Sequence, residues 1–461
     1  MMILSERIHK TWKEKKIFTA IFMDVAGAFN NVHHERLIHN LRKRRIPHAI
    51  SLWVASFLRN RSTQLQFNGT KSKHIPTPAG VPQGSPLSPL LYMYYNADLL
   101  DIASQNQVMG LGFIDDVVYG VQGNTGKENT RKLKSILNEA EEWRKKHGAQ
   151  FEISKYIVVH YTRNRTRKTK ASVTINGVTI KPSNEAKYLG VIFDQELRFK
   201  LHLQHAVKKG TNAAMALSSI AKSTWGAPYT YVRQLFQAVV APRIDYAAIV
   251  WHRPKDDGST AGTMQMRKIT TIQRLAMKAI LGCYRTTATA AMEVETGLPP
   301  PWIRLQTKAL LATTRMQSLS TRHPIQEWLA NALRTRTAVI SHQSNLENIL
   351  QQFPHMCGRI ETIETHIRPP WWTPTVKIKI ETTKSNAKDQ HDITQMHSDT
   401  TTVTIYTDGS GIENTIGAAA YNSATTSVSH QYLESETQFN VYTAELTAVH
   451  LAIKQLWNHC E

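Results

Sequence analysis

The sequence has few cysteines, no long hydrophobic run and no start typical of a secreted protein. Its 461 residues include three cysteines, Cys283, Cys357 and Cys460, which lie far apart and form no Cys-x-x-Cys pair. This spacing excludes a disulfide framework and a zinc ribbon, and it is typical of a reducing compartment. No stretch approaches the roughly eighteen uncharged apolar residues of a membrane-spanning helix, and the N-terminus lacks the apolar segment of a signal peptide. We therefore expect an intracellular protein, nuclear or cytoplasmic, without membrane contact.

Negative charge is scarce relative to positive charge. The chain has 56 Lys and Arg but 35 Asp and Glu, which gives a formal net charge of +21 (56 − 35). An excess of this size favours a polyanionic partner, nucleic acid above all, over the alternative of a basic protein tuned only for solubility. The length exceeds that of one hydrophobic core and predicts about two to four domains.

The predicted elements form an α/β region followed by a helical region. Up to residue 180 the patterns indicate strands at 18–23, 115–116 and its flanks, 153–161 and 173–180, helices at 32–60, 90–102 and 130–147, and a hairpin at 64–75. A loop rich in Pro and Gly covers 76–89, and residues 202–340 are almost wholly helical. Residues 381–400 are polar and poorly periodic, so a flexible linker is expected there. Strands at 403–410 and 417–421 and a helix at 442–457 follow.

Two adjacent carboxylates, Asp115 and Asp116, lie in a run of strand-forming residues at 112–118. Burying them unpaired would cost several kcal/mol, so we expect them at a hairpin tip, in water or around a cation. Mg²⁺ prefers such hard oxygen ligands. Asp24, at the end of the first predicted strand, is the candidate third carboxylate, and three carboxylates from neighbouring strands can hold two metal ions. Taken alone, the aspartate pair is more simply interpreted as a solvated turn.

Three motifs occur in order along the chain: Phe-x-Asp-Val-x-x-Ala-Phe at 22–29, Gly-Val-Pro-Gln-Gly-Ser-Pro-Leu-Ser-Pro at 80–89 and Phe-Ile-Asp-Asp at 113–116. This set resembles the palm motifs of reverse transcriptases from non-LTR (LINE-like, jockey-type) retrotransposons. Segments at 188–194, 281–287, 295–300 and 369–372 are also similar to that family. The resemblance implies the α+β palm of a right-hand polymerase and a helical thumb. It further implies RNA-directed DNA polymerase activity, with dNTPs, an RNA template or RNA/DNA hybrid, and two Mg²⁺ ions (or Mn²⁺).

The same resemblance assigns roles to individual residues. Asp24, Asp115 and Asp116 are implied as catalytic metal ligands, with the Val25 carbonyl as an extra ligand, and Phe29 as a steric gate against a ribose 2′-hydroxyl. The other implied nucleotide-binding residues are Gly27, Ala28, Gln83, Gly84 and Lys155, and the segment beginning at Tyr188, Leu189 and Gly190 resembles the primer grip. Two alternatives stay open: Lys155 as a solvated strand-end lysine, and simple strand packing for residues 188–193.

Two basic clusters are candidate contacts for template or hybrid phosphates. They consist of Arg42, Lys43, Arg44 and Arg45, and of Arg163, Arg165, Arg167 and Lys168. Charge runs are often only solvated faces, and the second cluster would serve equally well as a nuclear-import signal.

The C-terminal segment, at 404–410, 417–421 and 443–449, resembles the start of a ribonuclease H fold and implies Asp408 and Glu445 as metal ligands. Because the chain stops sixteen residues after Glu445 (461 − 445), we expect a truncated α/β module with little or no ribonuclease H activity. The family's fingers segments, which normally precede the first motif, are expected to be largely missing.

The predicted domains are a palm at 1–200, a helical thumb or connector at 201–345, a connector and flexible linker at 346–400, and the N-terminal part of a ribonuclease H-like domain at 401–461. The leading hypothesis is thus a fragment of a retrotransposon polyprotein with polymerase activity. The alternative is a catalytically inactive nucleic-acid-binding remnant. A group-II-intron maturase is disfavoured because it does not fit the ribonuclease H-like tail.

Overall fold

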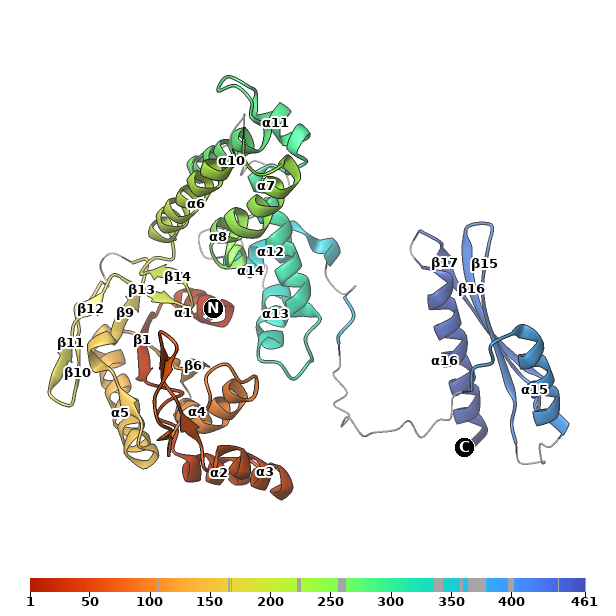
Figure 1. The fold of residues 1–461 in the computed structure, drawn as a ribbon, viewed down its shortest axis with the longest axis horizontal. Coiled ribbons are helices and arrows are strands. Elements are labelled where there is room, and N and C mark those ends of the chain that lie inside the picture. Colours follow the sequence, from red (N-terminus) through yellow and green to blue (C-terminus); the bar gives the residue numbers. More distant parts are fainter. Residues whose placement is uncertain are drawn as a thin grey trace. The chain divides into compact units, whose positions relative to one another are not determined.

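The chain folds into two compact units, residues 1–366 and 367–461, each described here by itself (Figure 1). The computed structural model describes residues 1–106, 108–164, 166, 168–221, 225–255, 263–334, 343–356, 360–363, 379–396, 402–437 and 439–460. The division between the units falls inside the segment 346–400 that the sequence predicts to be a connector. The finer assignments of palm, thumb and ribonuclease H-like domain stay predictions.

A six-stranded sheet, antiparallel except for one edge pair, forms the centre of the first unit. Its order is β12-β9-β1-β7-β6, with β8 paired to the end of β1. β1 is central because its side chains are apolar on both faces: Phe18 and Phe22 belong to one core, and Ile21 and Met23 to the other. The strands are β1 (Ile17–Ala26), β6 (Met109–Phe113), β7 (Asp116–Gly123), β8 (Gln150–Phe151), β9 (Ile157–Tyr161) and β12 (Pro182–Ser183).

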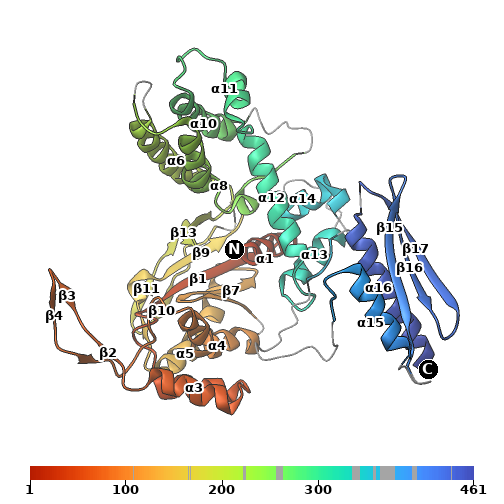
Figure 2. The same ribbon diagram turned by 45° about the vertical axis from the view of Figure 1, so that its right-hand side comes forward.

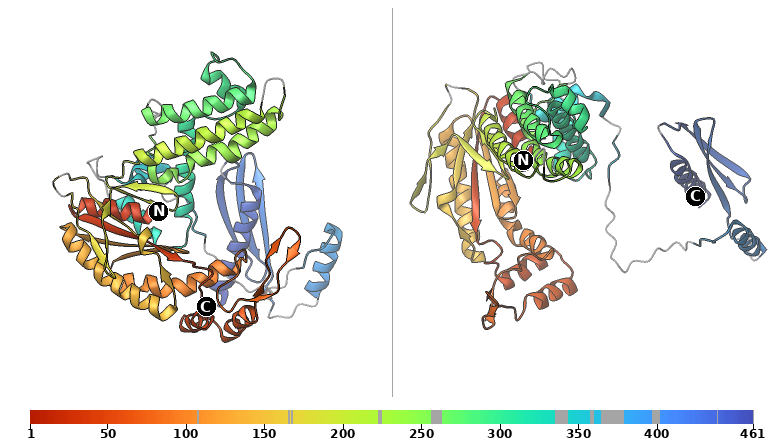
Figure 3. Two further views of the ribbon diagram at one scale, coloured as in Figure 1. Left: turned by 60° about the vertical axis from the view of Figure 1, so that its left-hand side comes forward. Right: turned by 45° about the horizontal axis from the view of Figure 1, so that its top comes forward.

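Helices and a hairpin cover the two faces of this sheet (Figure 3). On one face, Leu37, Leu91 and Leu133 from three helices join the core of β1 and β7. On the other face, Leu4 of the first helix and Phe193 of a hairpin do so. The covering elements are α1 (Met2–Lys13), α2 (His34–Lys43), α3 (His48–Leu58), α4 (Leu87–Gln105), α5 (Gly126–His147), β13 (Glu185–Tyr188) and β14 (Val191–Asp194).

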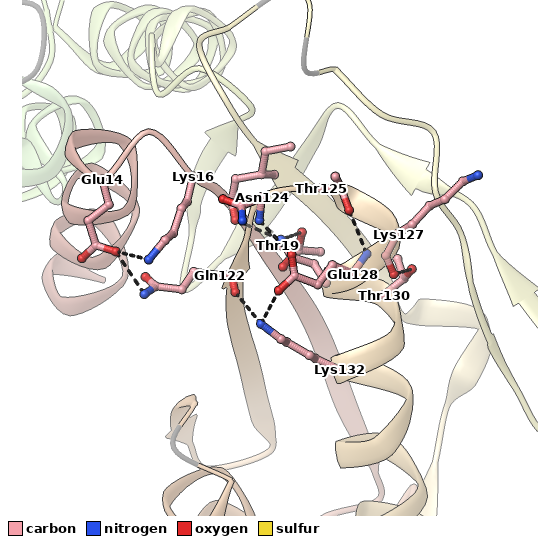
Figure 4. A network of polar contacts seen from close by, with 12 residues as sticks. Glu14, Lys16, Thr19, Gln122, Asn124, Thr125, Lys127, Glu128, Thr130 and Lys132 are labelled. Carbon is pink, nitrogen blue, oxygen red and sulfur yellow. Dashed lines mark hydrogen bonds and ion pairs between the residues drawn. The ribbon is translucent and has the colours of Figure 1, made fainter.

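A network of polar side chains joins the end of β7 to the start of α5 (Figure 4). The Thr125 hydroxyl caps α5 by accepting the N–H of Glu128 at 3.2 Å, and the Glu128 carboxylate accepts the N–H of Asn124 at 3.0 Å. One turn later, Lys132 donates to Glu128 at 2.7 Å and to the Gln122 carbonyl at 3.1 Å. These bonds satisfy the free N–H groups of the helix start and explain why α5 begins four residues before the predicted helix.

Two hairpins and a turn refine the predicted strands. The expected hairpin near 64–75 is a narrow arm, which Figure 2 shows projecting from its unit; its strands are β2 (Ser62–Thr63), β3 (Gln66–Phe67), β4 (Thr70–Lys71) and β5 (Ile75–Pro76). The predicted strand at 173–180 is instead a hairpin of β10 (Val173–Ile175) and β11 (Val178–Ile180), because Asn176 and Gly177 adopt positive φ. The strand predicted from 153 starts at 157, after the 3₁₀ turn η1 (Ile153–Lys155).

The described residues from 200 onward in this unit form mainly helices, in line with the prediction for 202–340. The elements are α6 (Lys200–Ile220), α7 (Tyr229–Leu235), the π-helix η3 (Phe236–Val240), α8 (Ala241–Asp245), α9 (Ala248–Trp251), α10 (Met264–Leu281), α11 (Thr289–Thr296), α12 (Pro301–Gln317), α13 (Ile325–Arg334), α14 (Asn345–Gln352) and the 3₁₀ turn η6 (Pro354–Met356). Their core is continuous with the α1 face of the sheet: Ile269 and Leu305 belong to the same cluster as Phe18. A bidentate ion pair, Arg304 to the buried Asp245 at 2.7 and 3.1 Å, fastens α12 to α8.

The second unit is a three-stranded antiparallel sheet with two helices: α15 (Lys384–Met396), β15 (Ile405–Ile412), β16 (Thr415–Asn422), β17 (Ser427–Ser435) and α16 (Val441–Cys460). Within the segment 381–400, which the sequence predicts to be a flexible linker, residues 384–396 are helical. The Thr383 hydroxyl accepts the N–H of Asn386 at 3.2 Å and caps this helix. None of its side chains is buried, so its sequence lacks the apolar stripe that reveals most helices.

Among the described residues, no helix combines the length and apolarity needed to cross a membrane.

Candidate active site

β1 and β7 bring the predicted carboxylates together at one end of the central sheet. Asp24 pairs directly with Asp116 across the antiparallel ladder, which places their Cα atoms about 5 Å apart. Asp115 occupies the turn before β7, and its carbonyl accepts the N–H of Val25 at 3.3 Å. Burial, followed by the negative charges of Asp115 and Asp24, raises the pKa of Asp116. Three carboxylates therefore converge and repel one another.

A strained turn presents Asp115. Ile114 has φ +55°, a conformation that a β-branched residue rarely adopts. The Asn96 side-chain amide of α4 donates to the Ile114 carbonyl at 3.0 Å and holds the turn in place. Strain of this kind persists where the surrounding structure imposes it, often at functional sites.

Lys155 lies at the carboxylates but in a different element from the one predicted. It ends the turn η1 instead of lying on a strand, because the N–H of Lys155 bonds locally to the Glu152 carbonyl at 2.9 Å. Its Nζ bonds to Glu152 at 2.6 Å and to Asp24 Oδ2 at 2.9 Å. These two carboxylates, Glu152 first, raise the pKa of Lys155. Its role toward pyrophosphate stays a prediction.

The loop rich in Pro and Gly lies against the turn that follows β1. The N–H of Val81 donates to the Phe29 carbonyl at 2.8 Å, and the Gln83 amide donates to Asn30 Oδ1 at 3.2 Å. Gly80 has φ +86°, and a Cβ there would lie 2.7 Å from the Asn30 carbonyl oxygen. Glycine is thus required for the loop to approach the turn so closely.

The residues predicted to contact the nucleotide line this turn and loop. The half-buried Phe29 packs its ring on Tyr92, with 5.5 Å between centroids, and Ala28 is buried beside it. Gly27 has φ +58°, in a turn that Asn31 closes by donating to the Ala26 carbonyl at 3.1 Å. At Gly84, with φ +92°, a Cβ would meet no atom within 4 Å, so this part of the loop is open.

The hairpin of β13 and β14 lies beside the carboxylates. Tyr188 is 4% exposed and packs on Phe22 at 5.7 Å, and burial, followed by the charge of Asp116, raises its pKa to about 12. The Tyr246 hydroxyl donates to the Leu189 carbonyl at 2.9 Å, and Gly190 approaches the ring of Tyr246. Tyr188 therefore packs against the sheet, and a contact of Tyr188, Leu189 and Gly190 with nucleic acid stays a prediction.

The carboxylate oxygens at this end of the sheet are possible ligands for a metal ion. Within the described ranges, no group of three or more His, Cys, Asp or Glu side chains is already arranged around a metal position. Instead, the ammonium group of Lys155 forms an ion pair with one carboxylate oxygen of Asp24. The chemistry nevertheless fits a hard divalent cation, because three carboxylates lie at this end of the sheet, and burial, followed by the charges of Asp115 and Asp24, disfavours the charged form of Asp116.

The first basic cluster is divided between internal ion pairs and exposed side chains. Lys43 bonds to Asp98 at 3.1 Å, and Arg44 bonds to Asp98 at 2.8 Å and Asp101 at 2.5 Å. Arg42 and Arg45 are exposed. Lys43 and Arg44 thus fasten α2 to α4, and nucleic-acid contact by this cluster stays a prediction.

The second basic cluster lies only partly within the described residues, since Arg165 and Arg167 fall outside them. The Arg163 guanidinium lies over the Trp12 ring at 4.4 Å, and Lys168 bonds to Glu196 at 3.1 Å. Arg163 and Lys168 therefore have structural contacts, whatever else they bind.

In the second unit, the backbone of β15 next to Asp408 lies close to the backbone of α16 at Glu445. A Cβ on Gly409 of β15 would lie 2.4 Å from the backbone nitrogen of Glu445 on α16, an approach that only glycine permits. Both acidic side chains are exposed. Their role as metal ligands stays a prediction.

Three residues near the carboxylates were not predicted: Asn96, Tyr92 and Glu152. Asn96 holds the Ile114 turn, Glu152 binds Lys155, and the Tyr92 hydroxyl is buried without a hydrogen-bond partner in the described part of the chain. Burial, then the charge of Asp115, raises the pKa of Tyr92. Tyr92 and Asn96 are four residues apart and hence on one helix face, which is the signal that would have found them.

Residues 2–193 match the family described as reverse transcriptase (RNA-dependent DNA polymerase), so this part of the chain is a reverse transcriptase domain. The chain is 28% identical over 344 residues to the RNA-directed DNA polymerase from mobile element jockey of Drosophila funebris, covering 72% of this chain and 35% of that protein. It is 26% identical over 285 residues to the probable RNA-directed DNA polymerase from transposon BS of Drosophila melanogaster, covering 61% and 31%. The chain is thus similar, over more than half of its length, to RNA-directed DNA polymerases from non-LTR retrotransposons.

The chain spans about a third of the length of these two relatives. Among solved structures, Candida tropicalis telomerase in complex with a fragment of telomeric RNA aligns with 71% of this chain and 50% of its own, at 12% identity and a TM-score of 0.36.

Proposed function

We propose that this chain catalyses RNA-directed DNA synthesis, the addition of deoxynucleotides to a primer 3′-hydroxyl on an RNA template. One observation carries the proposal: Asp24 and Asp116 are paired across β1 and β7, with Asp115 in the adjoining turn. The reverse transcriptase match of residues 2–193 supports it, and so does the similarity to relatives that are named as RNA-directed DNA polymerases. The net charge of +21 suits a nucleic-acid substrate.

In this proposal Asp24, Asp115 and Asp116 hold two Mg²⁺ ions, with the Val25 carbonyl as a further ligand. Bound there, such ions activate the primer hydroxyl and neutralise charge on the leaving pyrophosphate. The side chain of Lys155 is 57% exposed and already lies at Asp24, so its ammonium group is placed to meet the departing phosphates.

The turn and loop beside the carboxylates would receive the nucleotide. The Phe29 ring, braced by Tyr92, would fill the space that a ribose 2′-hydroxyl needs and so favour deoxynucleotides. Gly27 and Ala28 leave the backbone accessible to the triphosphate, and Gln83 and Gly84 would lie against the base pair being formed.

We propose a separate and weaker role for the second unit. Asp408 and Glu445 would hold a divalent ion as a pair, but two carboxylates bind metal poorly without further ligands. We therefore expect little or no ribonuclease H activity from this chain.

The test is primer extension by the purified chain on poly(rA)/oligo(dT) with dTTP and Mg²⁺. Asp115→Asn is expected to reduce incorporation by on the order of 10³-fold, because a lost carboxylate removes several kcal/mol of transition-state stabilisation. The same substitution at the exposed Asp389 on α15 is the control and should leave incorporation unchanged.

Binding of the labelled hybrid is measured alongside incorporation. If the wild-type chain binds the hybrid but adds no nucleotide, the chain is a binding remnant and the proposal is wrong. The same conclusion follows if incorporation survives Asp115→Asn.

A further inference from the structure

A cavity of about 430 Å³ lies in the first unit, where β14 leads into α6 and where α9 and α10 meet. Its apolar wall includes Trp251, Met266 and Ile269. Its basic lining consists of Arg163, Arg198, Lys200, Arg253 and Lys255. Arg163 lies two residues after Tyr161 of β9, and Tyr161 pairs with Phe18 of β1. Phe18 lies six residues before Asp24 on the same strand. At the rise of a β-strand this separation is about 20 Å, so the cavity is distinct from the carboxylate site.

Positive charges are crowded in this cavity. Burial, followed by the charges of Arg253 and Arg198, lowers the pKa of Arg163 to about 10, and burial also lowers that of Arg253. Arg253 is fixed by neutral oxygens, since its Nε donates to Asn345 Oδ1 at 2.9 Å and its Nη2 to the Gln343 carbonyl at 2.7 Å. These bonds orient the guanidinium, and Glu347 and Glu6 offset part of its charge.

The carboxylates near the cavity are engaged in other interactions. Asp194 accepts the N–H groups of Glu196, Arg198 and Phe199 at 3.1, 3.0 and 2.6 Å. Glu196 bonds to Arg198 at 2.6 Å and to Lys168 at 3.1 Å, so it offsets part of the positive charge. Lys200 and Lys255 are exposed at the rim and add to the excess.

His252 supplies an independent sign of an absent partner. This residue is part of the cavity lining and is only 7% exposed, and its Nε2 has no hydrogen-bond partner within the described residues. A buried polar atom left unpaired costs about 1–3 kcal/mol, which a bound ligand would recover. The start of the 18-residue helix α10 lies beside it: Thr263, Gln265 and Met266 also line the cavity, and a helix N-terminus attracts anions.

We propose that this cavity binds a backbone phosphate of the nucleic acid, at a distance from the site of nucleotide addition. Arg163, Arg253 and the start of α10 would surround the phosphate oxygens, and His252 would complete their hydrogen bonds. Arg198 and Lys200 at the rim would meet the neighbouring phosphates. The inference rests on the proposed function in one respect, namely that the ligand is a nucleic acid. The single-stranded template and the hybrid both have backbone phosphates, so either could bind.

The first test reverses the rim charges. Equilibrium binding of labelled oligo(rA), alone and paired with oligo(dT), is measured over a range of salt concentrations for the Arg198→Glu/Lys200→Glu variant. We expect its affinity to fall about tenfold or more and the slope of log K against log salt to fall by about 1–2, because each phosphate contact contributes about 0.7–0.9. Affinity is compared for the single strand and for the hybrid. The nucleic acid whose affinity falls is the one that occupies the cavity. The matched control, Lys134→Glu/Lys146→Glu, makes the same charge change on exposed positions of α5 and should keep the wild-type slope.

The second test removes the unpaired nitrogen of His252. His252→Phe keeps an aromatic ring, so we expect the free protein to be as stable as the wild type or more stable. Its affinity for the oligonucleotide should fall about three- to tenfold, the worth of one hydrogen bond. A residue with only a structural role would not lower affinity while leaving the free protein equally stable.

The outcomes separate this inference from the proposed function. Asp115→Asn should bind the oligonucleotides like the wild type although it adds almost no nucleotides, whereas the rim variant should lose affinity for them. If the wild type binds neither oligonucleotide, the proposed function fails and the cavity proposal fails with it. If the wild type binds and extends primers but the rim variant matches its α5 control in affinity and slope, only the cavity proposal is wrong.

Discussion

At the scale of single residues, the contact between the Pro- and Gly-rich loop and the turn after β1 depends on one missing side chain. A Cβ on Gly80 would lie 2.7 Å from the Asn30 carbonyl oxygen and 2.9 Å from that of Phe29. Both oxygens belong to the backbone, so neither can rotate away. Gly84 also has positive φ, but a Cβ there meets open space.

These two glycines make a matched pair for mutation. Gly84→Ala should destabilise the chain by about 1 kcal/mol, the strain of positive φ alone. Gly80→Ala should cost about 2–3 kcal/mol, because the clash with the backbone adds to the same strain. Urea unfolding at constant m value measures both losses. Equal losses at the two positions would show that the close approach at Gly80 contributes nothing.

Some residues could be predicted from the sequence because local patterns determine their position. Asp24 follows an apolar strand, and Asp115 lies in a hairpin turn, so their convergence requires only that two strands pair. His252 carried no such signal, because its surroundings come from distant segments: Arg253, the next residue, bonds to Asn345, 92 positions away in the chain. Burial of this kind depends on tertiary packing, which no short pattern reports.

At the scale of elements, α1 is joined to α14 through a buried carboxyl group. The side chain of Glu6 lies at the start of α14, where Ser344 and the Leu346 N–H donate hydrogen bonds to it. Desolvation outweighs these bonds, and together with the charge of Glu347 it raises the pKa of Glu6 from 4.5 to about 8. Lys13, about two helix turns further along α1, forms an ion pair with Glu347.

The raised pKa of Glu6 predicts how stability depends on pH. The folded state holds this proton up to about pH 8 and the unfolded state releases it near 4.5, so between these values the folded state binds more protons and stability falls as pH rises. Each pH unit in this window removes at most about 1.4 kcal/mol. Glu6→Gln should abolish this part of the decline and be more stable than the wild type at pH 9.

The measurement is urea unfolding at a series of pH values from 6 to 9, with roughly even steps. Glu142→Gln, at a side chain that is 62% exposed, is the control and should follow the wild-type curve. A Glu6→Gln variant whose stability declines with pH as steeply as the wild type would show that Glu6 is already ionised in the folded chain.

Elements differed in how well their sequences predicted them. β1 was predictable because it is a continuous apolar run that is buried on both faces, and α5 because it buries apolar side chains at helical spacing. α15 was missed because it buries none, and the turn η1 was missed because its local hydrogen bonds leave no mark on hydrophobic periodicity. The predicted division at residue 200 between palm and thumb has no counterpart in the core, which joins Phe18 of the sheet to Ile269 and Leu305 of the helices.

At the scale of the whole molecule, the cores define what can fold separately. The second unit has its own core, built from Ile416, Ala418, Leu433, Ala444 and Ala448. The first unit has two cores on the two faces of one sheet, and the core on the α1 face extends into the helices after residue 200. A cut between the units therefore leaves the cores intact, whereas a cut at residue 200 exposes a large apolar surface.

We accordingly expect a fragment of residues 1–366 to fold cooperatively and to retain primer extension on poly(rA)/oligo(dT). A fragment of residues 1–200 contains all three palm carboxylates but should be insoluble or unfolded, because Phe18 and its neighbours lose the helices that cover them. Circular dichroism with urea unfolding checks the folding of each fragment, and incorporation of dTTP checks its activity against the full chain. If residues 1–200 unfold cooperatively and extend primers, the helices are not part of the polymerase core. If residues 1–366 fold but lose activity, the second unit contributes to synthesis directly.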